Sequence, residues 1–123
     1  MASDVLIVDD SAAIRKILQR VLQQTDVTFG EIQEAGDGLE AIEKLKQKRF
    51  GLVLSDINMP NMDGIQLLSQ MRAHAEWSSI PVVMITTEGS QAKVLEAVDL
   101  GARGYVRKPF TADHIKEKLV GII

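Results

Sequence analysis

The sequence predicts an α/β domain in which helices cover both faces of a doubly wound, five-stranded parallel sheet. Short runs of branched apolar residues, continuous rather than alternating, are typical of strands that are buried on both faces. Segments with a helical apolar period separate these runs, so that strand and helix alternate along the chain. With 123 residues, 46% hydrophobic and 25% charged, the chain fits one globular domain over residues 1–123.

The first half of the chain supplies three extended segments and two helices. Residues 5–8 form an apolar run, and residues 28–35 alternate less regularly and contain a glycine and two glutamates, which favours an edge strand. Residues 52–54 form the next buried run. Between these strands, apolar residues recur at helical spacing on two stripes: Ile14, Ile17, Leu18, Val21 and Leu22, then Ala41, Ile42 and Leu45.

The second half continues the alternation with two strands and three helices. Apolar runs at residues 82–85 and 105–106 complete the five strands. Right-handed crossovers between parallel strands place the helices on both faces, so each helical stripe should face the sheet. The three stripes consist of Ile65, Leu68 and Met71, of Val94, Leu95 and Val98, and of Ile115, Leu119 and Ile122.

Charge and composition exclude several classes of function. Lys and Arg number 14 against 17 Asp and Glu, a net charge of −3, which makes nucleic acid and anionic membranes poor partners. The absence of cysteine excludes disulfides, thiolate zinc sites and cysteine nucleophiles. No export signal and no run of ~18 apolar residues occurs. We therefore expect a cytoplasmic protein that does not enter a membrane.

Acidic residues follow two of the predicted strands, at the point where each strand ends. Asp9 and Asp10 follow the first run, and Asp56 follows the third. Singly, Asp9 or Asp10 could cap the next helix. The carboxyl ends of parallel strands meet at one edge, however, and three carboxylates there repel one another unless a cation neutralises them. An all-oxygen ligand set favours Mg²⁺, and aspartates in place of glycines disfavour a nucleotide or flavin phosphate.

Thr86 and Lys108 end the last two strands and should lie at the same edge. Each has an ordinary structural explanation, since Lys108 could be a solvated surface lysine and the Thr86 hydroxyl could cap the following helix. Next to three carboxylates, a clustered ammonium is more typical of a functional site. The Thr86 hydroxyl could equally donate a hydrogen bond to an anion.

Five motifs occur in a characteristic order and spacing: Val8-Asp9-Asp10-Ser11, Ala35-Gly36-Asp37-Gly38-Leu39-Glu40-Ala41, Asp56-Ile57-Asn58-Met59-Pro60-Asn61-Met62-Asp63-Gly64, Thr86, and Lys108-Pro109-Phe110. Together they resemble the receiver domain of two-component response regulators, and most of all its stand-alone chemotaxis type. The resemblance covers the whole chain. It implies a flavodoxin-like fold with strand order 2-1-3-4-5 and a cis peptide bond before Pro109.

The resemblance also implies a role for each residue at the strand ends. Asp56 would accept a phosphoryl group from the phosphohistidine of a sensor histidine kinase, in a magnesium-dependent reaction. Asp10, Asp56 and the main-chain carbonyl of Asn58 would ligate Mg²⁺, and Asp9 would contribute through water. Lys108 would pair with the phosphoryl group.

A conformational switch is implied as well. Thr86 would reorient to hydrogen-bond the phosphoryl oxygen, and Tyr105 would turn into the space it leaves, as two states of one equilibrium. Asn58, Thr87 and Glu88 would flank the phosphoryl group where attacking water approaches. Thr87 departs from the small residue that the family often carries there.

The leading hypothesis is therefore a stand-alone signalling switch rather than a turnover enzyme. The face formed by its fourth helix, fifth strand and fifth helix would bind an output protein, for which a flagellar motor switch and a phosphorelay protein are the candidates. The alternative is a small phosphatase of the haloacid dehalogenase type, which also uses an aspartyl nucleophile and Mg²⁺. That reaction needs a second acidic residue two positions after Asp56, where this chain has Asn58. An inactive receiver is disfavoured by intact Asp10, Thr86 and Lys108.

Overall fold

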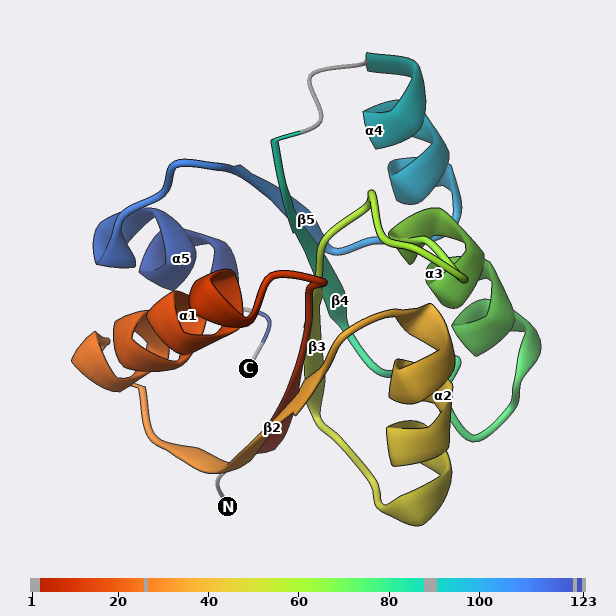
Figure 1. Cartoon of the computed structure of the whole chain (residues 1–123), viewed down its shortest axis with the longest axis horizontal. Coiled ribbons are helices and arrows are strands. Elements are labelled where there is room, and N and C mark those ends of the chain that lie inside the picture. Colours follow the sequence, from red (N-terminus) through yellow and green to blue (C-terminus); the bar gives the residue numbers. More distant parts are fainter. Residues whose placement is uncertain (1–2, 26, 88–90, 121, 123) are drawn as a thin grey trace.

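A parallel sheet of five strands forms the centre of the molecule (Figure 1). The computed structural model describes residues 3–25, 27–87, 91–120 and 122. The strands stand in the order β2-β1-β3-β4-β5, with every neighbouring pair parallel, which confirms the predicted fold class and order. Their bounds are β1 Ser3–Val8, β2 Phe29–Ala35, β3 Leu52–Ser55, β4 Val82–Thr86 and β5 Gly104–Arg107.

Five helices cover the two faces of this sheet. Helices α1 and α5 pack together on one face, and α2, α3 and α4 lie on the other (Figure 1). Side-chain caps fix the starts of four helices, because Ser11, Asp37, Asp63 and Thr111 each accept a hydrogen bond from an amide in the first helical turn. The bounds are α1 Ala12–Gln24, α2 Gly38–Gln47, α3 Gly64–Ala73, α4 Gln91–Asp99 and α5 Ala112–Leu119.

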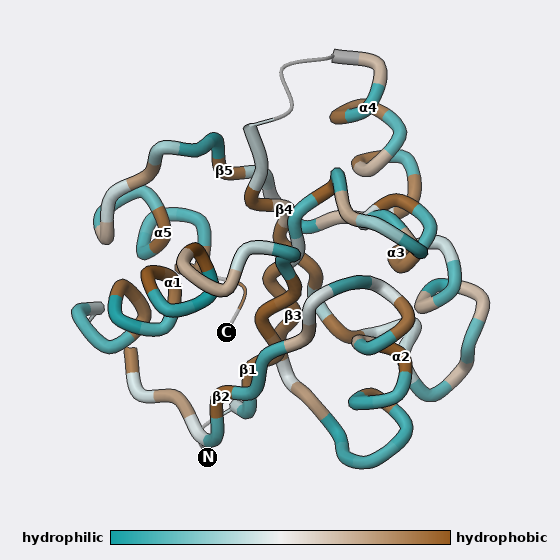
Figure 2. Tube along the Cα trace, in the orientation of Figure 1, coloured by the Kyte–Doolittle hydropathy of each residue, from teal (hydrophilic) through white to brown (hydrophobic). Residues whose placement is uncertain are grey.

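The core consists of two apolar layers, one on each face of the sheet. Alternate side chains of a strand point to opposite faces, so Val5 and Ile7 pack with α1 and α5, whereas Leu6 and Val8 pack with the other three helices. Figure 2 shows hydrophobic residues along the strands and on the helix sides that face them. Burial on both faces explains why β1 is a continuous apolar run.

Two of the predicted helical stripes are partly wrong. Ile17, predicted to face the sheet, is 46% exposed, and Leu95 and Val98 on α4 are 60% and 54% exposed. In α4 the residue buried against the core is Ala97 instead. Apolar residues occur on more than one side of this helix, so their spacing alone does not select the buried side.

The edge position predicted for residues 28–35 is confirmed, because β2 pairs only with β1 among the described strands. Its pairing shifts register between Ser3 and Val5, an irregularity common at sheet edges. No helix among the described residues combines the length and the apolar character that crossing a membrane requires.

Candidate functional site

Four polar side chains lie at the carboxyl edge of the sheet because the parallel register brings the strand ends level. Val8 of β1 is paired with Ser55 of β3, so Asp9 and Asp56, the next residues along, are neighbours. Thr86, the last residue of β4, is paired with Arg107 of β5, and the Lys108 amide donates to the Thr86 carbonyl at 3.0 Å. The predicted convergence of these strand ends is confirmed.

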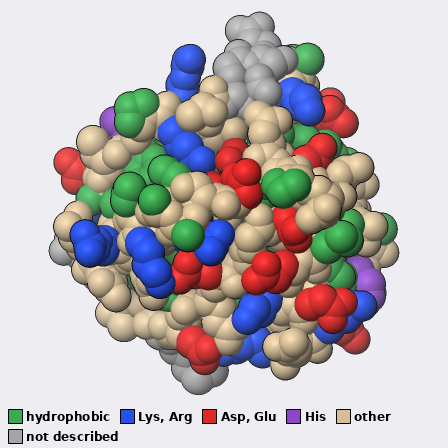
Figure 3. All heavy atoms as spheres, in the orientation of Figure 1, with side chains coloured by type: hydrophobic (Ala, Val, Ile, Leu, Met, Phe, Trp, Pro, Cys, Tyr) green, Lys and Arg blue, Asp and Glu red, His purple; other side chains and the backbone are tan. Residues whose placement is uncertain are grey.

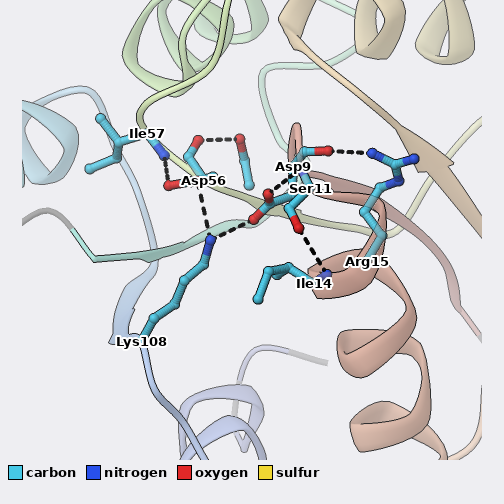
Figure 4. A network of polar contacts seen from close by, with 8 residues as sticks. Asp9, Ser11, Ile14, Arg15, Asp56, Ile57 and Lys108 are labelled. Atoms are coloured by element: carbon cyan, nitrogen blue, oxygen red, sulfur yellow. Dashed lines mark hydrogen bonds and ion pairs between the residues drawn. The ribbon is translucent and has the colours of Figure 1, made fainter.

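Lys108 bridges two of the three carboxylates (Figure 4). Its Nζ lies 2.7 Å from Oδ2 of Asp9 and 3.1 Å from Oδ2 of Asp56. The Lys108 side chain is only 12% exposed, against 1% for Asp9 and 10% for Asp56. Lys108 is therefore not the solvated surface lysine of the ordinary explanation, since its ammonium is withdrawn from water and paired with buried anions.

Asp9 is held by both carboxylate oxygens. While Oδ2 contacts Lys108, Oδ1 accepts a hydrogen bond from the Ser11 amide at 2.9 Å. Ser11, and neither aspartate, caps α1, because its Oγ accepts from the Ile14 amide at 3.2 Å (Figure 4). The carboxylates of Asp9 and Asp10 therefore do not serve as the N-cap of α1.

Burial shapes the ionisation of this cluster. Burial raises the pKa of the Asp9 carboxyl, an effect that the Lys108 and Ser11 hydrogen bonds only partly oppose. Burial alone would lower the pKa of the Lys108 ammonium, but its contacts with Asp9 and Asp56 outweigh that effect and raise it. The site therefore keeps its lysine charged and resists the charging of Asp9.

Asp56 is anchored through its main chain as well as its side chain. Its Oδ1 accepts a hydrogen bond from the Ile57 amide at 2.7 Å, which leaves Oδ2 for Lys108. The carbonyl of Asp56 accepts from Ser55 Oγ at 2.8 Å and lies against Gly64, the first residue of α3. A Cβ on Gly64 would stand 2.0 Å from that carbonyl oxygen, so glycine permits the close approach of α3 to the site.

Asp9, Asp10 and Asp56 together fit a hard divalent cation. One carboxylate oxygen from each lies within 4.8 Å of the others, and Asp10 is exposed to solvent whereas the other two are buried. Oxygen donors with no nitrogen or sulfur among them are the set that Mg²⁺ prefers. Three carboxylates against one lysine leave an excess of negative charge that such a cation would neutralise. Acidic side chains also gather near the middle of the face seen in Figure 3.

The remaining predicted site residues differ in how they are placed. Thr86 is fully buried at the end of β4, whereas Thr87 and Asn58 are exposed. Tyr105 on β5 is half-buried and packs against the core layer beneath α2, α3 and α4. Glu88 lies outside the described residues. The peptide bond between Lys108 and Pro109 is cis, as expected.

Arg15 on α1 belongs to this network, although nothing in the sequence singled it out. Its Nη1 donates to the main-chain carbonyl of Asp9 at 2.6 Å (Figure 4). Its Nε pairs with Glu34 Oε1 at 2.9 Å. A basic residue one turn after a helix cap is common on helix surfaces. Only the three-dimensional placement of β2 beside β1 brings Glu34 within its reach.

Comparison with known proteins agrees with the site geometry. A family model described as "Response regulator receiver domain" matches residues 5–120. Chemotaxis protein CheY-3 of Vibrio cholerae is 46% identical over 115 residues, covering 94% of this chain and 87% of the relative.

Solved structures show the same likeness. The chemotaxis protein CheY4 of Vibrio cholerae superposes with a TM-score of 0.88 at 34% identity, covering 100% of both chains. A complex from Borrelia burgdorferi described as CheX-CheY-BeF3-Mg has a TM-score of 0.88 at 31% identity, covering 98% of this chain and 88% of that one.

Proposed function

Because this chain belongs to the response regulator receiver family, in which phosphoryl acceptance is coupled to signal relay, we propose that Asp56 is its phosphoacceptor and a histidine kinase its donor. The observation that carries this proposal is the pair of contacts from Lys108 Nζ to Asp9 at 2.7 Å and Asp56 at 3.1 Å. They hold an ammonium beside Asp56, whose other carboxylate oxygen accepts from the Ile57 amide, with Asp9 held in the same way by Lys108 and the Ser11 amide.

Phosphoryl transfer requires the protein mainly to position the reacting groups and to stabilise the charge on the transferred oxygens. An Asp56 oxygen forms a bond to phosphorus while the bond from phosphorus to the donor's imidazole nitrogen breaks, and the imidazole leaves with the electron pair of that bond. Lys108 lies where it can pair with the oxygens of the transferred group. Asp9 and Asp10 would help to hold Mg²⁺, which when bound neutralises charge that develops on those oxygens.

The signal would leave the site through Thr86 and β5. Thr86 is buried beside the site, and its main chain is bonded to that of Lys108, three residues after Tyr105. A phosphoryl group at Asp56 would favour the conformation in which hydrogen-bond donors such as the Thr86 hydroxyl turn toward it. A free-energy preference of ~1–3 kcal/mol for that conformation is enough to shift the equilibrium between the two conformations. We propose that Thr86 reorients toward the phosphoryl oxygen and that Tyr105 turns into the space it leaves, with Asn58, Thr87 and Glu88 flanking the phosphoryl group.

The output partner is proposed from the relatives. The Vibrio cholerae relatives are chemotaxis proteins, and the Borrelia burgdorferi structure contains CheX with a CheY. We propose a chemotaxis output for this chain, a flagellar motor switch or a CheX-like protein, with a phosphorelay protein as the alternative. The haloacid dehalogenase hypothesis finds no support in the family membership.

The test uses acetyl phosphate as donor, with intact-protein mass spectrometry to count phosphoryl groups. In Mg²⁺ we expect one phosphoryl group on the wild type and on Asp99→Asn, a control that removes an exposed carboxylate of α4 away from the site. Asp56→Asn should take up none, and chelation of Mg²⁺ should abolish uptake by the wild type. Equal labelling of Asp56→Asn and the wild type would assign the acceptor elsewhere, and labelling that ignores Mg²⁺ would refute the role of the acidic cluster.

A further inference from the structure

Arg15 makes a contact that concerns the peptide between Asp9 and Asp10 rather than either carboxylate. Its Nη1 donates to the Asp9 carbonyl oxygen at 2.6 Å (Figure 4). The same guanidinium is fixed from the other side, because its Nε donates to Glu34 Oε1 at 2.9 Å. A guanidinium is a rigid fork, so two bonds to different segments fix its plane and, through it, the Asp9 carbonyl.

The two neighbouring aspartates are held very differently. Asp9 has every polar group engaged: its amide donates to Ala35, its carbonyl accepts from Arg15, and its carboxylate contacts Ser11 and Lys108. The carboxylate of Asp10 is exposed and makes no hydrogen bond or ion pair with the described part of the chain. Its direction therefore depends on the orientation of the peptide that precedes it.

We propose that Arg15 is a positioning residue for the divalent cation: by holding the Asp9 carbonyl, it orients the Asp9–Asp10 peptide so that the Asp10 carboxylate faces the carboxylates of Asp9 and Asp56. The inference rests on the proposed function only in that this cation is the one phosphoryl transfer requires. Groups that orient metal ligands from behind are typically worth a factor of 10 to 100 in metal affinity.

Glu34 and Lys16 complete the arrangement around Arg15. Lys16 Nζ also contacts Glu34 at 2.9 Å, but its side chain is 67% exposed, against 20% for Arg15 and 22% for Glu34. Burial pushes the pKa of Glu34 upward, but the bonds from Lys16 and Arg15 outweigh it and lower that pKa, so Glu34 is an anion at neutral pH. Lys16 thus shares the ion pair of Arg15 without touching Asp9, which makes it the matched control.

Simple electrostatics predicts the opposite sign from positioning. Replacement of Arg15 by methionine removes a positive charge near the acidic cluster, which on charge alone would tighten cation binding. If Arg15 acts by orienting Asp10, the same substitution weakens binding. Arg15→Lys keeps the positive charge but replaces the rigid guanidinium by a single flexible ammonium. Its Mg²⁺ affinity should equal that of the wild type only if Arg15 acts through its charge alone.

The experiment titrates Mg²⁺ into the unphosphorylated wild type, Arg15→Met, Arg15→Lys and Lys16→Met by calorimetry. We expect an increase in Kd of roughly 10-fold for Arg15→Met, a smaller increase for Arg15→Lys, and a change of less than about 2-fold for Lys16→Met. Urea unfolding of each variant in Mg²⁺-free buffer identifies the folded fraction, to which the Kd values refer.

A second readout separates positioning from general damage. In acetyl phosphate labelling, Arg15→Met should require about 10-fold more Mg²⁺ for half-maximal rate and reach nearly the wild-type rate at saturation. Unchanged or tighter Mg²⁺ binding by Arg15→Met would overturn the inference, as would a lower saturated rate with an unchanged Mg²⁺ requirement. Failure of the wild type to be labelled would refute the proposed function but leave the calorimetric result decisive for Arg15.

Discussion

Substitution of Gly64 by alanine tests whether the start of α3 fixes the position of Asp56. The added Cβ would stand 2.0 Å from the Asp56 carbonyl oxygen and 2.9 Å from the Ile57 Cα, both main-chain atoms that cannot swing aside. Ordinary contact requires the two segments to separate by roughly 1 Å or more. The Gly64 amide also donates to the Ile57 carbonyl at 2.7 Å, and this short bond would be stretched by the same movement.

The expected loss of stability follows from two opposing effects. Overpacking against a rigid neighbour costs about 1–3 kcal/mol, and occasionally more. Alanine restricts the unfolded chain and returns about 0.4–1 kcal/mol where its backbone angles are allowed, as they are at Gly64. We expect a net loss of about 1–2 kcal/mol in the free energy of unfolding, measured by urea denaturation, with a fall in Tm of roughly 4–8 °C.

The same movement should impair chemistry, since displacement of a reacting group by about 1 Å can cost 10²-fold in rate. We expect phosphorylation of Gly64→Ala by acetyl phosphate to slow by about that factor in saturating Mg²⁺. Gly104→Ala is the matched control, because its Cβ would meet only side-chain atoms at 3.7 Å and beyond. If Gly64→Ala matches Gly104→Ala in stability and labelling rate, the close approach of α3 does not position Asp56.

Three further predictions concern the N-cap of α3, the Asp4–Lys48 ion pair at the amino-terminal end of β1, and the binding of Mg²⁺. Asp63→Ala removes a capping box and should lower the free energy of unfolding by about 1 kcal/mol in urea; no loss would show that the cap is dispensable. The hydrogen bond and charge of Lys48 lower the pKa of Asp4, so this pair stabilises the fold above about pH 4 and loses its effect as pH falls through the lowered pKa. Urea curves of wild type and Lys48→Met should therefore differ near pH 7, and the difference should shrink as the pH falls below about 4; a difference independent of pH would contradict this. Mg²⁺ should raise the Tm of the wild type in calorimetry because it binds the folded state, and Asp10→Asn should respond less; equal responses would exclude Asp10 as a ligand.

The fold could be predicted from the sequence because its strongest signals come from burial on both sides of the sheet. Residues 5–8 of β1 and all residues of β3 and β4 have no solvent-facing side, so their apolar runs have few alternative explanations. Helix α4 was harder to predict, since it bears apolar residues on several sides and Ala97, a small residue, makes the contact with the core. Its exposed Leu95 and Val98 have the same helical period as a buried stripe.

The candidate site likewise has residues that the sequence predicts and residues that only the structure reveals. Asp9, Asp56 and Lys108 could be predicted to meet, because parallel strands bring their carboxyl ends to one edge whatever the details of packing. Which residue caps α1 and what holds the Asp9 carbonyl depend on side-chain directions and on β2 lying beside β1, which no local pattern encodes. Ser11 and Arg15 therefore emerged only from the structure.

The position of Lys108 links the charge of the site to the strand that would carry the signal. Its ammonium is shared between Asp9 and Asp56, while its main-chain amide is bonded to Thr86 at the end of β4. A doubly charged phosphoryl group on Asp56 would attract the ammonium more strongly than Asp9 does, so under the proposed function the sharing of Lys108 would change on phosphorylation. Lys108 directly follows β5, so a rearrangement of its side chain would also act on the strand that contains Tyr105. Lys108 thus connects the charge on Asp56, through its side chain, with the packing of β4 and β5, through its main chain.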